Sequence, residues 1–138
     1  MASVFTKIIK REIPAHIVYE DDKVIAFLDI IQTTPGHVLV ACKHEYQSIL
    51  DLPEEEAAHL FAVTTRLAKA VQQAFQPAGI NLVSNNGAQA GQTVFHFHIH
   101  LIPRYPHDDI KIQFKNRIHE THEDDYLERA RRIRQALT

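Results

Sequence analysis

The chain has 138 residues, of which 45% are hydrophobic and 23% are charged, an ordinary composition for a single soluble domain. A formal net charge of -2 excludes a general electrostatic attraction to nucleic acids or anionic membranes, so any phosphate binding must come from a local site. The single cysteine, Cys42, excludes an internal disulfide and any multi-cysteine metal site. No apolar run approaches the roughly 20 residues that cross a bilayer. We therefore expect a cytoplasmic protein that binds a small partner.

The first half of the sequence predicts a short helix followed by the beginning of a sheet. Phe5, Ile8 and Ile9 stand at helical spacing before Pro14, which predicts a helix that ends near the proline. The polar residues 21–23 are typical of a hairpin turn between two strands. Over the whole chain, the runs with strand-like patterns are 16–20, 24–29, 37–42, 80–83 and 94–102.

Two further helices are predicted, one long and one near the end of the chain. Between Leu52 and Phe75 apolar residues recur every three or four positions, and Pro53 with three following glutamates is typical of a helix start. A weaker helical pattern runs from Tyr126 to Leu137 among several arginines and predicts a surface or interface helix. The sequence contains no internal repeat and no sign of a second domain.

Three histidines alternate with apolar residues in the last predicted strand. Side chains of a strand point to opposite faces in turn, so His96, His98 and His100 should share one face while Phe97 and Ile99 share the other. A lone histidine on a strand is usually an ordinary polar residue. Three in strict alternation indicate a functional row.

Two kinds of chemistry suit such a row. Neutral imidazoles are common ligands of zinc and iron, so the three histidines could bind a metal ion. Alternatively, one imidazole attacks a phosphorus atom and its neighbours donate hydrogen bonds to phosphate oxygens. The loop 85–93 offers amides, hydroxyls and glycines but no carboxylate, which favours phosphate over metal.

The run His96-Phe-His-Ile-His-Leu-Ile102 resembles the motif of the histidine triad (HIT) family. The segment Ala90-Gly-Gln-Thr-Val94 is similar to that family's Gly-Gln-Ser/Thr-Val element. The segments 27–30 and Pro35-Gly-His37 resemble its nucleoside-pocket strand and its fourth histidine. The resemblance covers about residues 4–104 and points to the branch that includes the purine nucleoside phosphoramidases.

The resemblance implies an α+β fold with a mainly antiparallel sheet of about five strands, a long helix and a short N-terminal helix. It also implies a homodimer in which the two sheets become continuous. Residues 1–138 would form a single HIT domain, with its core at about 4–104 and a helix-containing extension at about 105–138.

The resemblance also implies a role for each site residue. His98 matches the nucleophile, His96 and His37 would orient it, and His100 would contact the phosphate. Gln92 and Thr93 would bind phosphate oxygens or the leaving group, and Asp29 would accept hydrogen bonds from the ribose hydroxyls. The nucleotide pocket as a whole would comprise Val4, Phe5, Ile8, Phe27, Asp29, Ile30, Asn85, Gly91, Gln92, Thr93, His98 and His100.

The reaction implied is attack by His98 on the α-phosphorus of a nucleoside phosphoramidate or a dinucleoside polyphosphate. The expected partner is a purine nucleotide such as AMP or another adenosine derivative, and no cofactor is expected. Two alternatives are a nucleotide-binding regulatory protein with little turnover and a histidine-ligated metalloenzyme.

Many relatives carry a structural zinc held by a Cys-x-x-Cys pair near the N-terminus and a histidine after the third strand. The matching positions here are Ser3, Thr6 and Glu45. We therefore expect no structural zinc in this chain.

Overall fold

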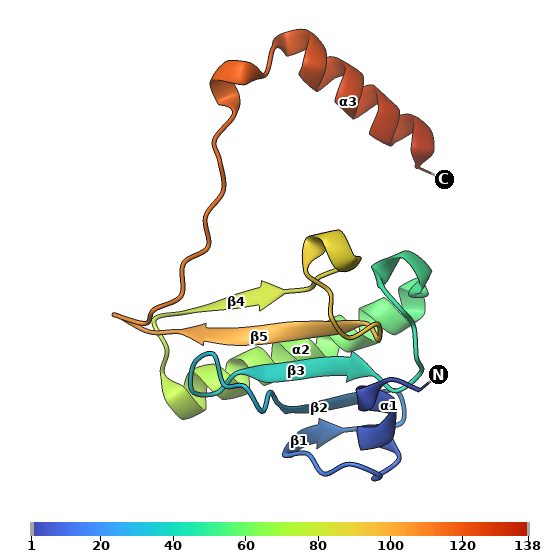
Figure 1. Ribbon diagram of the computed structural model, residues 1–138, viewed down its shortest axis with the longest axis vertical. Coiled ribbons are helices and arrows are strands. Elements are labelled where there is room, and N and C mark those ends of the chain that lie inside the picture. The colour runs from blue at the N-terminus through green and yellow to red at the C-terminus, as the bar shows by residue number, and fades with distance from the viewer. Residues whose placement is uncertain (1, 138) are drawn as a thin grey trace.

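The computed structural model describes residues 2–137 as a five-stranded antiparallel sheet with helices on both faces (Figure 1). In chain order the elements are α1 (Val4–Ile9), β1 (Ile17–Glu20), β2 (Val24–Leu28), β3 (Val38–Cys42), η1 (Ile49–Asp51), α2 (Glu54–Phe75), β4 (Gly79–Val83), η2 (Ala88–Ala90), β5 (His98–Arg104), η3 (Ile118–Glu120) and α3 (Glu123–Ala136). The strand order is β1-β2-β3-β5-β4. The predicted α+β class, with its long helix and short N-terminal helix, is confirmed.

The long helix α2 covers one face of the sheet. Its apolar side, with Leu60, Val63 and Leu67, packs against Val40 of β3 and Ile99 of β5 in the larger of two buried clusters. The first turn carries three glutamates, which interact favourably with the positive end of the helix dipole. No helix described between residues 2 and 137 is both long and apolar enough to cross a bilayer.

The short helix α1 covers part of the opposite face, which we call the histidine face. Phe5 and Ile8 of α1 pack on Phe27, Leu39 and Ala41 in a second buried cluster. Ser3 caps the helix by accepting a hydrogen bond from the Thr6 N–H at 3.1 Å. Since β5 pairs His98 with Ala41 and His100 with Leu39, the two histidines point to the same face as α1.

The last strand begins later than its sequence pattern predicts. We expected strand structure over 94–102, but β5 runs from His98 to Arg104. Its neighbour β3 ends at Cys42, one residue beyond the partner of His98, so residues 94–96 lie past the end of that strand. The chain instead bends there, and the Phe97 N–H donates to the carbonyl of Tyr46 at 2.6 Å. His96 therefore lies just outside the sheet.

The end of the chain leaves the sheet. Beyond Arg104 the backbone passes the edge formed by β4, and α3 lies on the far side of that edge (Figure 1). We call residues 110–137 the arm. None of the residues of α3 is buried.

Candidate active site

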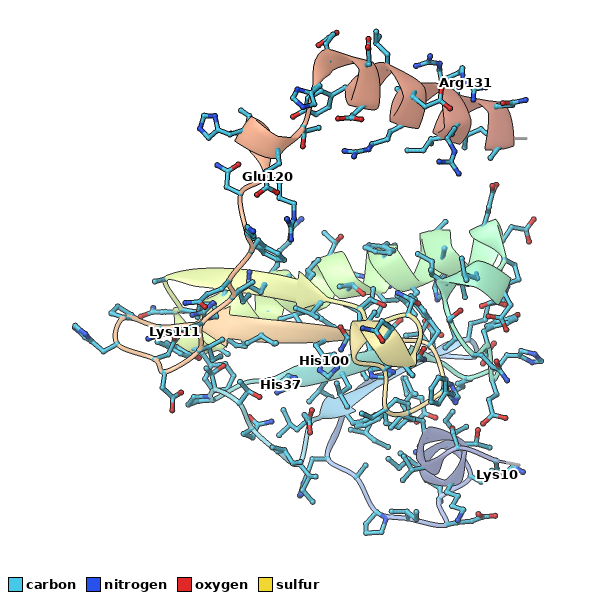
Figure 2. The ribbon with its side chains drawn as sticks, turned by 45° about the horizontal axis from the view of Figure 1, so that its top comes forward. Lys10, His37, His100, Lys111, Glu120 and Arg131 are labelled. Atoms are coloured by element: carbon cyan, nitrogen blue, oxygen red, sulfur yellow. The ribbon has the colours of Figure 1, made fainter. Side chains whose placement is uncertain are left out.

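Four histidines meet on the histidine face, close to the middle of the sheet. His98 and His100 come from β5, His96 precedes that strand, and His37 precedes β3. Figure 2 shows His37 and His100 on these neighbouring segments, and their ring nitrogens Nε2 and Nδ1 lie 3.0 Å apart. The rings of His98 and His100 have centroids 5.0 Å apart. His37 thus adds a fourth imidazole ring, from a distant segment of the chain, to the three histidines of the predicted row.

The tautomer of His98 follows from its one hydrogen bond to the backbone. Nδ1 of His98 lies 2.7 Å from the carbonyl oxygen of His96, which can only accept, so Nδ1 carries the proton. A neutral ring then has its lone pair on Nε2. His98 lines a cavity on this face. The ring is therefore held in the form that a nucleophile needs.

His96 is an anchor for the segment that leads into β5. Its Nε2 donates to the carbonyl of Cys42 at 2.6 Å, which leaves Nδ1 to accept from the Ser3 hydroxyl at 2.8 Å. The side chain is 0% exposed. His96 thus connects α1, β3 and β5, and its own carbonyl is the group that orients His98.

His37 and His100 form a relay of hydrogen bonds. The Thr33 N–H lies 3.4 Å from Nδ1 of His37, so we assign the His37 proton to Nε2, which donates to Nδ1 of His100. His100 then carries its own proton on Nε2. Because His100 lines the neighbouring cavity, that N–H could donate to an anionic oxygen bound there.

Burial keeps all four rings neutral near pH 7. Burial lowers the pKa of His98 below its ordinary value of 6.5, and the hydrogen bond to the His96 carbonyl only partly opposes this. Burial, together with the neighbouring His98 and His37, lowers the pKa of His100 to about 4. Burial also lowers the pKa of His37 and His96. The four rings are therefore available as neutral donors and acceptors rather than as permanent cations.

Asp29 is held at the edge of the site by the loop between β2 and β3. Its Oδ1 accepts from the Ile31 N–H at 2.9 Å, and its Oδ2 lies 3.5 Å from Nε2 of His37. The side chain of Gln32 ties the loop together by bonding the backbone of Asp29, Gly36 and His37. Within residues 2–137, Oδ2 of Asp29 thus has no backbone partner. Gln32, which no sequence pattern identified, sets the shape of the loop that positions this oxygen.

Gly36 allows the turn that delivers His37 to the site. Its φ of +92° lies in a region that residues with a side chain rarely adopt, and an added Cβ would approach the ring of Phe75 to 3.0 Å. The buried hydroxyl of Thr34 donates to the carbonyl of Pro103 at 2.6 Å and fastens the same loop to β5. The position of His37 therefore depends on this closely packed turn.

A cavity of about 220 Å³ lies against His98 and His100. Asp29 stands among its lining residues, and Asn85, Gly91 and Thr93 contribute from the loop before β5. A larger hollow of about 500 Å³ adjoins it and shares the wall formed by Thr93 and Val94. We place the chemistry in the smaller cavity because the histidines line that one and not the larger hollow.

Gln92 lines the cavity, as expected of a residue of the nucleotide pocket, and its side chain also holds the loop before β5. It is buried, its Oε1 accepts from the Gly87 N–H at 2.8 Å, and its Nε2 donates to the carbonyls of Gln47 and Val94. Because both amide protons of Gln92 are donated to these carbonyls, its side chain stabilises the loop from the interior of the protein. Of the two loop residues expected at the phosphate, only Thr93 keeps an exposed side chain at the cavity.

The apolar residues predicted to enclose the base fall into two groups, those at or beside the cavity and those away from it. Phe5 lines the cavity, with its ring centroid 4.8 Å from that of His98, and Phe27 supports Phe5 from the core. Ile8 is buried beside them. In contrast, Ile30 is 90% exposed and Val4 lines the larger hollow. Residues that line the cavity but were not predicted are Ile31, Leu39 and Val94.

The three triad histidines are not arranged as one ligand set, since both ring nitrogens of His96 are used by Ser3 and Cys42. Within residues 2–137, the group of metal-ligand types that does come together is Asp29, His37 and His100, with donor atoms within 4.8 Å of one another. A metal ion bound at this site would therefore have Asp29, His37 and His100 as its ligands, and not His96, His98 and His100. Cys42 is not a candidate ligand, because burial raises the pKa of its thiol to about 12.

The positions that match the zinc ligands of relatives contain a hydrogen-bond network. Oε1 of Glu45 accepts from the Ser3 N–H at 2.6 Å and from the Thr6 hydroxyl at 3.2 Å, and it lies 4.0 Å from Nδ1 of His96. The Ser3 N–H bond, followed by the hydroxyls, lowers the pKa of Glu45. Two neutral hydroxyls are poor replacements for thiolates, so this donor set does not fit a structural zinc.

Ser3 is therefore expected to act as a positioning residue for His96. Replacing Ser3 with Ala removes the donor to Nδ1 of His96 and should lower kcat about fivefold, with KM nearly unchanged, because one neutral hydrogen bond contributes about 1 kcal/mol. Ser3→Thr keeps the hydroxyl and should restore the rate. Steady-state kinetics of both variants test this. Equal loss of rate in both variants would instead indicate a general disturbance of α1.

Comparisons of the sequence and of the structure with known proteins find the same family. The sequence profile of the HIT domain matches residues 10–107. The protein Hit of Bacillus subtilis strain 168 is 43% identical over 123 residues, which is 89% of this chain and 82% of that protein. A crystal structure of a HIT family member from Bacillus subtilis superposes with a TM-score of 0.96 at 37% identity and covers 100% of this chain and 99% of that one. A histidine triad nucleotide-binding protein from Candida albicans superposes with a TM-score of 0.87 at 28% identity, covering 97% and 96%.

Proposed function

The chain belongs to the HIT domain family, and from this premise we propose that it is a nucleotide-binding hydrolase or transferase that works through a nucleotidyl-histidine intermediate. The proposed substrates are nucleoside phosphoramidates or dinucleoside polyphosphates, attacked at the α-phosphorus. The observation that carries the proposal is the state of His98. Its Nδ1–H is fixed on the His96 carbonyl, and its buried, neutral ring lines the cavity together with Phe5, Asp29 and Thr93.

The proposed reaction has two displacements at phosphorus. In the first, the Nε2 lone pair of His98 forms a bond to the α-phosphorus while the bond to the amine or phosphate leaving group breaks. The ring becomes positive, and the His96 carbonyl stabilises that charge through Nδ1–H. In the second, water attacks the same phosphorus, His98 Nε2 leaves, and the proton released by water balances the one gained by the leaving group.

The surrounding groups suit the charge that develops. The Nε2–H of His100 and the hydroxyl of Thr93 can donate to oxygens of the phosphoryl group, and both line the cavity with His98. Asn85 and Gly91 line the same cavity. Phe5 offers an apolar wall to a base, and Asp29, whose Oδ2 lies 4.0 Å from Nδ1 of His100, offers a carboxylate to ribose.

A purine nucleotide such as AMP is the proposed ligand, a preference taken from the family resemblance. The relative from Candida albicans is described as nucleotide-binding, which supports the ligand class. We further propose a homodimer that joins two copies through the free edge of β4, and a cytoplasmic location.

Turnover of adenosine 5′-phosphoramidate tests the proposed function directly. We expect AMP release, with kcat/KM constant above pH 6.5 and falling only on the acid side, because the lowered pKa of His98 delays protonation of the nucleophile. The measurement is AMP formation from pH 4.5 to 8.5, with dinucleoside polyphosphates as parallel substrates. Absence of release from every substrate would contradict the proposal. A rate that declines from pH 8 downward would contradict the assignment of a neutral buried histidine.

A further inference from the structure

Three side chains with metal-ligand atoms converge beside the cavity that His98 lines. Nε2 of His37 lies 3.0 Å from Nδ1 of His100 (Figure 2), and Oδ2 of Asp29 lies 3.5 Å from the first of these nitrogens and 4.0 Å from the second. The residues come from three segments: Asp29 follows β2, His37 precedes β3, and His100 lies in β5. Two imidazole nitrogens and one carboxylate oxygen thus form a compact triangle.

The size of this triangle matches a zinc ion. A point equally distant from three atoms with these separations lies about 2.1 Å from each of them. Zinc binds imidazole nitrogen at about 2.0–2.1 Å and carboxylate oxygen at about 2.0–2.2 Å. The three atoms therefore already have the separations that ligands have around zinc, and binding requires no movement of the backbone.

The chemistry of the three donors also favours zinc. Imidazole nitrogen suits zinc and its neighbours in the first transition row, whereas magnesium and calcium ions prefer sites built from oxygen atoms. Two histidines and one acid form a ligand set that leaves a fourth position of zinc open. Asp29 and His100 line the cavity, so an ion and its fourth ligand would enter from that side.

The loop between β2 and β3 holds the ligands in place before an ion binds. The side chain of Gln32 donates to the carbonyls of Asp29 and His37, which fixes the spacing of these two residues. The hydroxyl of Thr34 fastens the loop to β5, the strand that carries His100. The side chain of His37 is only 3% exposed. Little conformational freedom is therefore left for an ion to remove.

His37 can offer a lone pair to an ion once its proton moves from Nε2 to Nδ1. The Thr33 N–H lies 3.4 Å from Nδ1, a long contact whose loss costs little. A hydrogen bond between the His37 ring and the backbone of Ile31 raises the pKa of this histidine, so the moved proton has a partner in the same loop. Nδ1 of His100 is already the acceptor of the relay. The ion would thus replace the proton between the two rings, and neither ring would lose a proton overall.

We propose that Asp29, His37 and His100 form a zinc site, and that zinc bound there excludes the nucleotide. The exclusion rests on the proposed function, in which Asp29 accepts from ribose and His37 donates to His100. Zinc would occupy Oδ2 of Asp29 and would replace the hydrogen bond between the two histidines. Zinc is therefore an inhibitor of this chain and not a cofactor.

Cobalt(II) is the probe of the site, because four-coordinate cobalt absorbs visible light much more strongly than hydrated cobalt. Protein treated with a chelator should bind one cobalt ion per chain at this site, and zinc added afterwards should remove the absorption bands. D29N and H37Q each remove one ligand. Both should weaken metal binding about a hundredfold or more, since even the hydrogen-bond partners of ligands contribute 10- to 100-fold. D29N keeps the Oδ1 that accepts from the Ile31 N–H, so the loop should keep its shape.

His59→Gln is the matched control. Nε2 of His59 also faces a carboxylate, at 2.7 Å from Oδ2 of Asp21, but in the part of the chain that the structure describes this pair has no third metal-ligand side chain beside it. H59Q should keep the absorption bands and the metal affinity. Bands that survive in D29N or H37Q, or that disappear in H59Q, would overturn the proposal. Circular dichroism of each variant verifies that the sheet is intact.

Calorimetric titration of zinc into the chelator-treated protein, with and without AMP, tests the exclusion without turnover. With AMP at ten times its own Kd, zinc affinity should fall about tenfold, and zinc should weaken AMP binding reciprocally. Titration of zinc into AMP alone corrects for zinc that the nucleotide itself binds. An unchanged zinc affinity would overturn the exclusion. If zinc and AMP exclude each other but the zinc-free protein turns over no substrate, the metal site stands and the proposed catalytic function fails.

Discussion

Replacing His98 with Ala should reduce turnover of adenosine 5′-phosphoramidate by roughly a thousandfold or more, because the variant has no atom that can form the bond to phosphorus. AMP should still bind within a fewfold of the normal affinity, since Asp29, Thr93 and His100 remain in the cavity. Truncation of a mostly buried ring leaves a hole, so thermal unfolding must be measured beside the kinetics.

The matched control is His16→Ala, which removes an exposed side chain; the backbone carbonyl of His16, which accepts from the Leu28 N–H at 2.9 Å, is kept. This variant should keep the normal rate. A second readout uses mass spectrometry of acid-sensitive adducts: active protein stopped during turnover should carry one nucleotidyl group on the peptide that contains His98. An H98A variant that still turned over substrate, or an adduct on His96, would disprove the assignment of the nucleophile.

The sheet and its helices could be predicted because their signals are local. Continuous apolar runs rich in β-branched residues predicted β2 and β3 to within one residue at each end, and the three- and four-residue spacing of apolar residues predicted α2. The start of β5 could not be predicted, because it depends on where the neighbouring β3 ends. Pairing between strands is decided by distant segments, and sequence periodicity contains no information about it.

The residues of the site, too, could be predicted where the signal is local and could not where it depends on distant segments. The motif identified His98 and its neighbours, but the bonds that set each tautomer come from elsewhere: Ser3 and Cys42 on His96, and Thr33 on His37. Leu39 could have been found, since alternation along β3 places it on the face of Ala41. Gln32 had no usable signal, because its amide bridges backbone groups of a loop whose shape only the structure gives.

Replacing Asp29 with Asn should raise KM for adenosine 5′-phosphoramidate roughly 10- to 100-fold, since the lost charge weakens two hydrogen bonds from ribose hydroxyls. Asn preserves the Oδ1 that accepts from the Ile31 N–H, so the loop should keep its shape. We expect kcat to change less than about threefold, because the ribose contact is made equally in the ground state and the transition state.

The second role open to Asp29 is electrostatic, because its Oδ2 lies 3.5 Å from His37 and 4.0 Å from His100. The carboxylate raises the pKa of both rings, in opposition to burial. A substrate without the 2′ and 3′ hydroxyls distinguishes the two roles. If Asp29 binds ribose, D29N and the unchanged protein should have the same KM for that substrate. If Asp29 acts through the histidines, D29N should lower kcat for both substrates equally, and the ribose assignment would then be wrong.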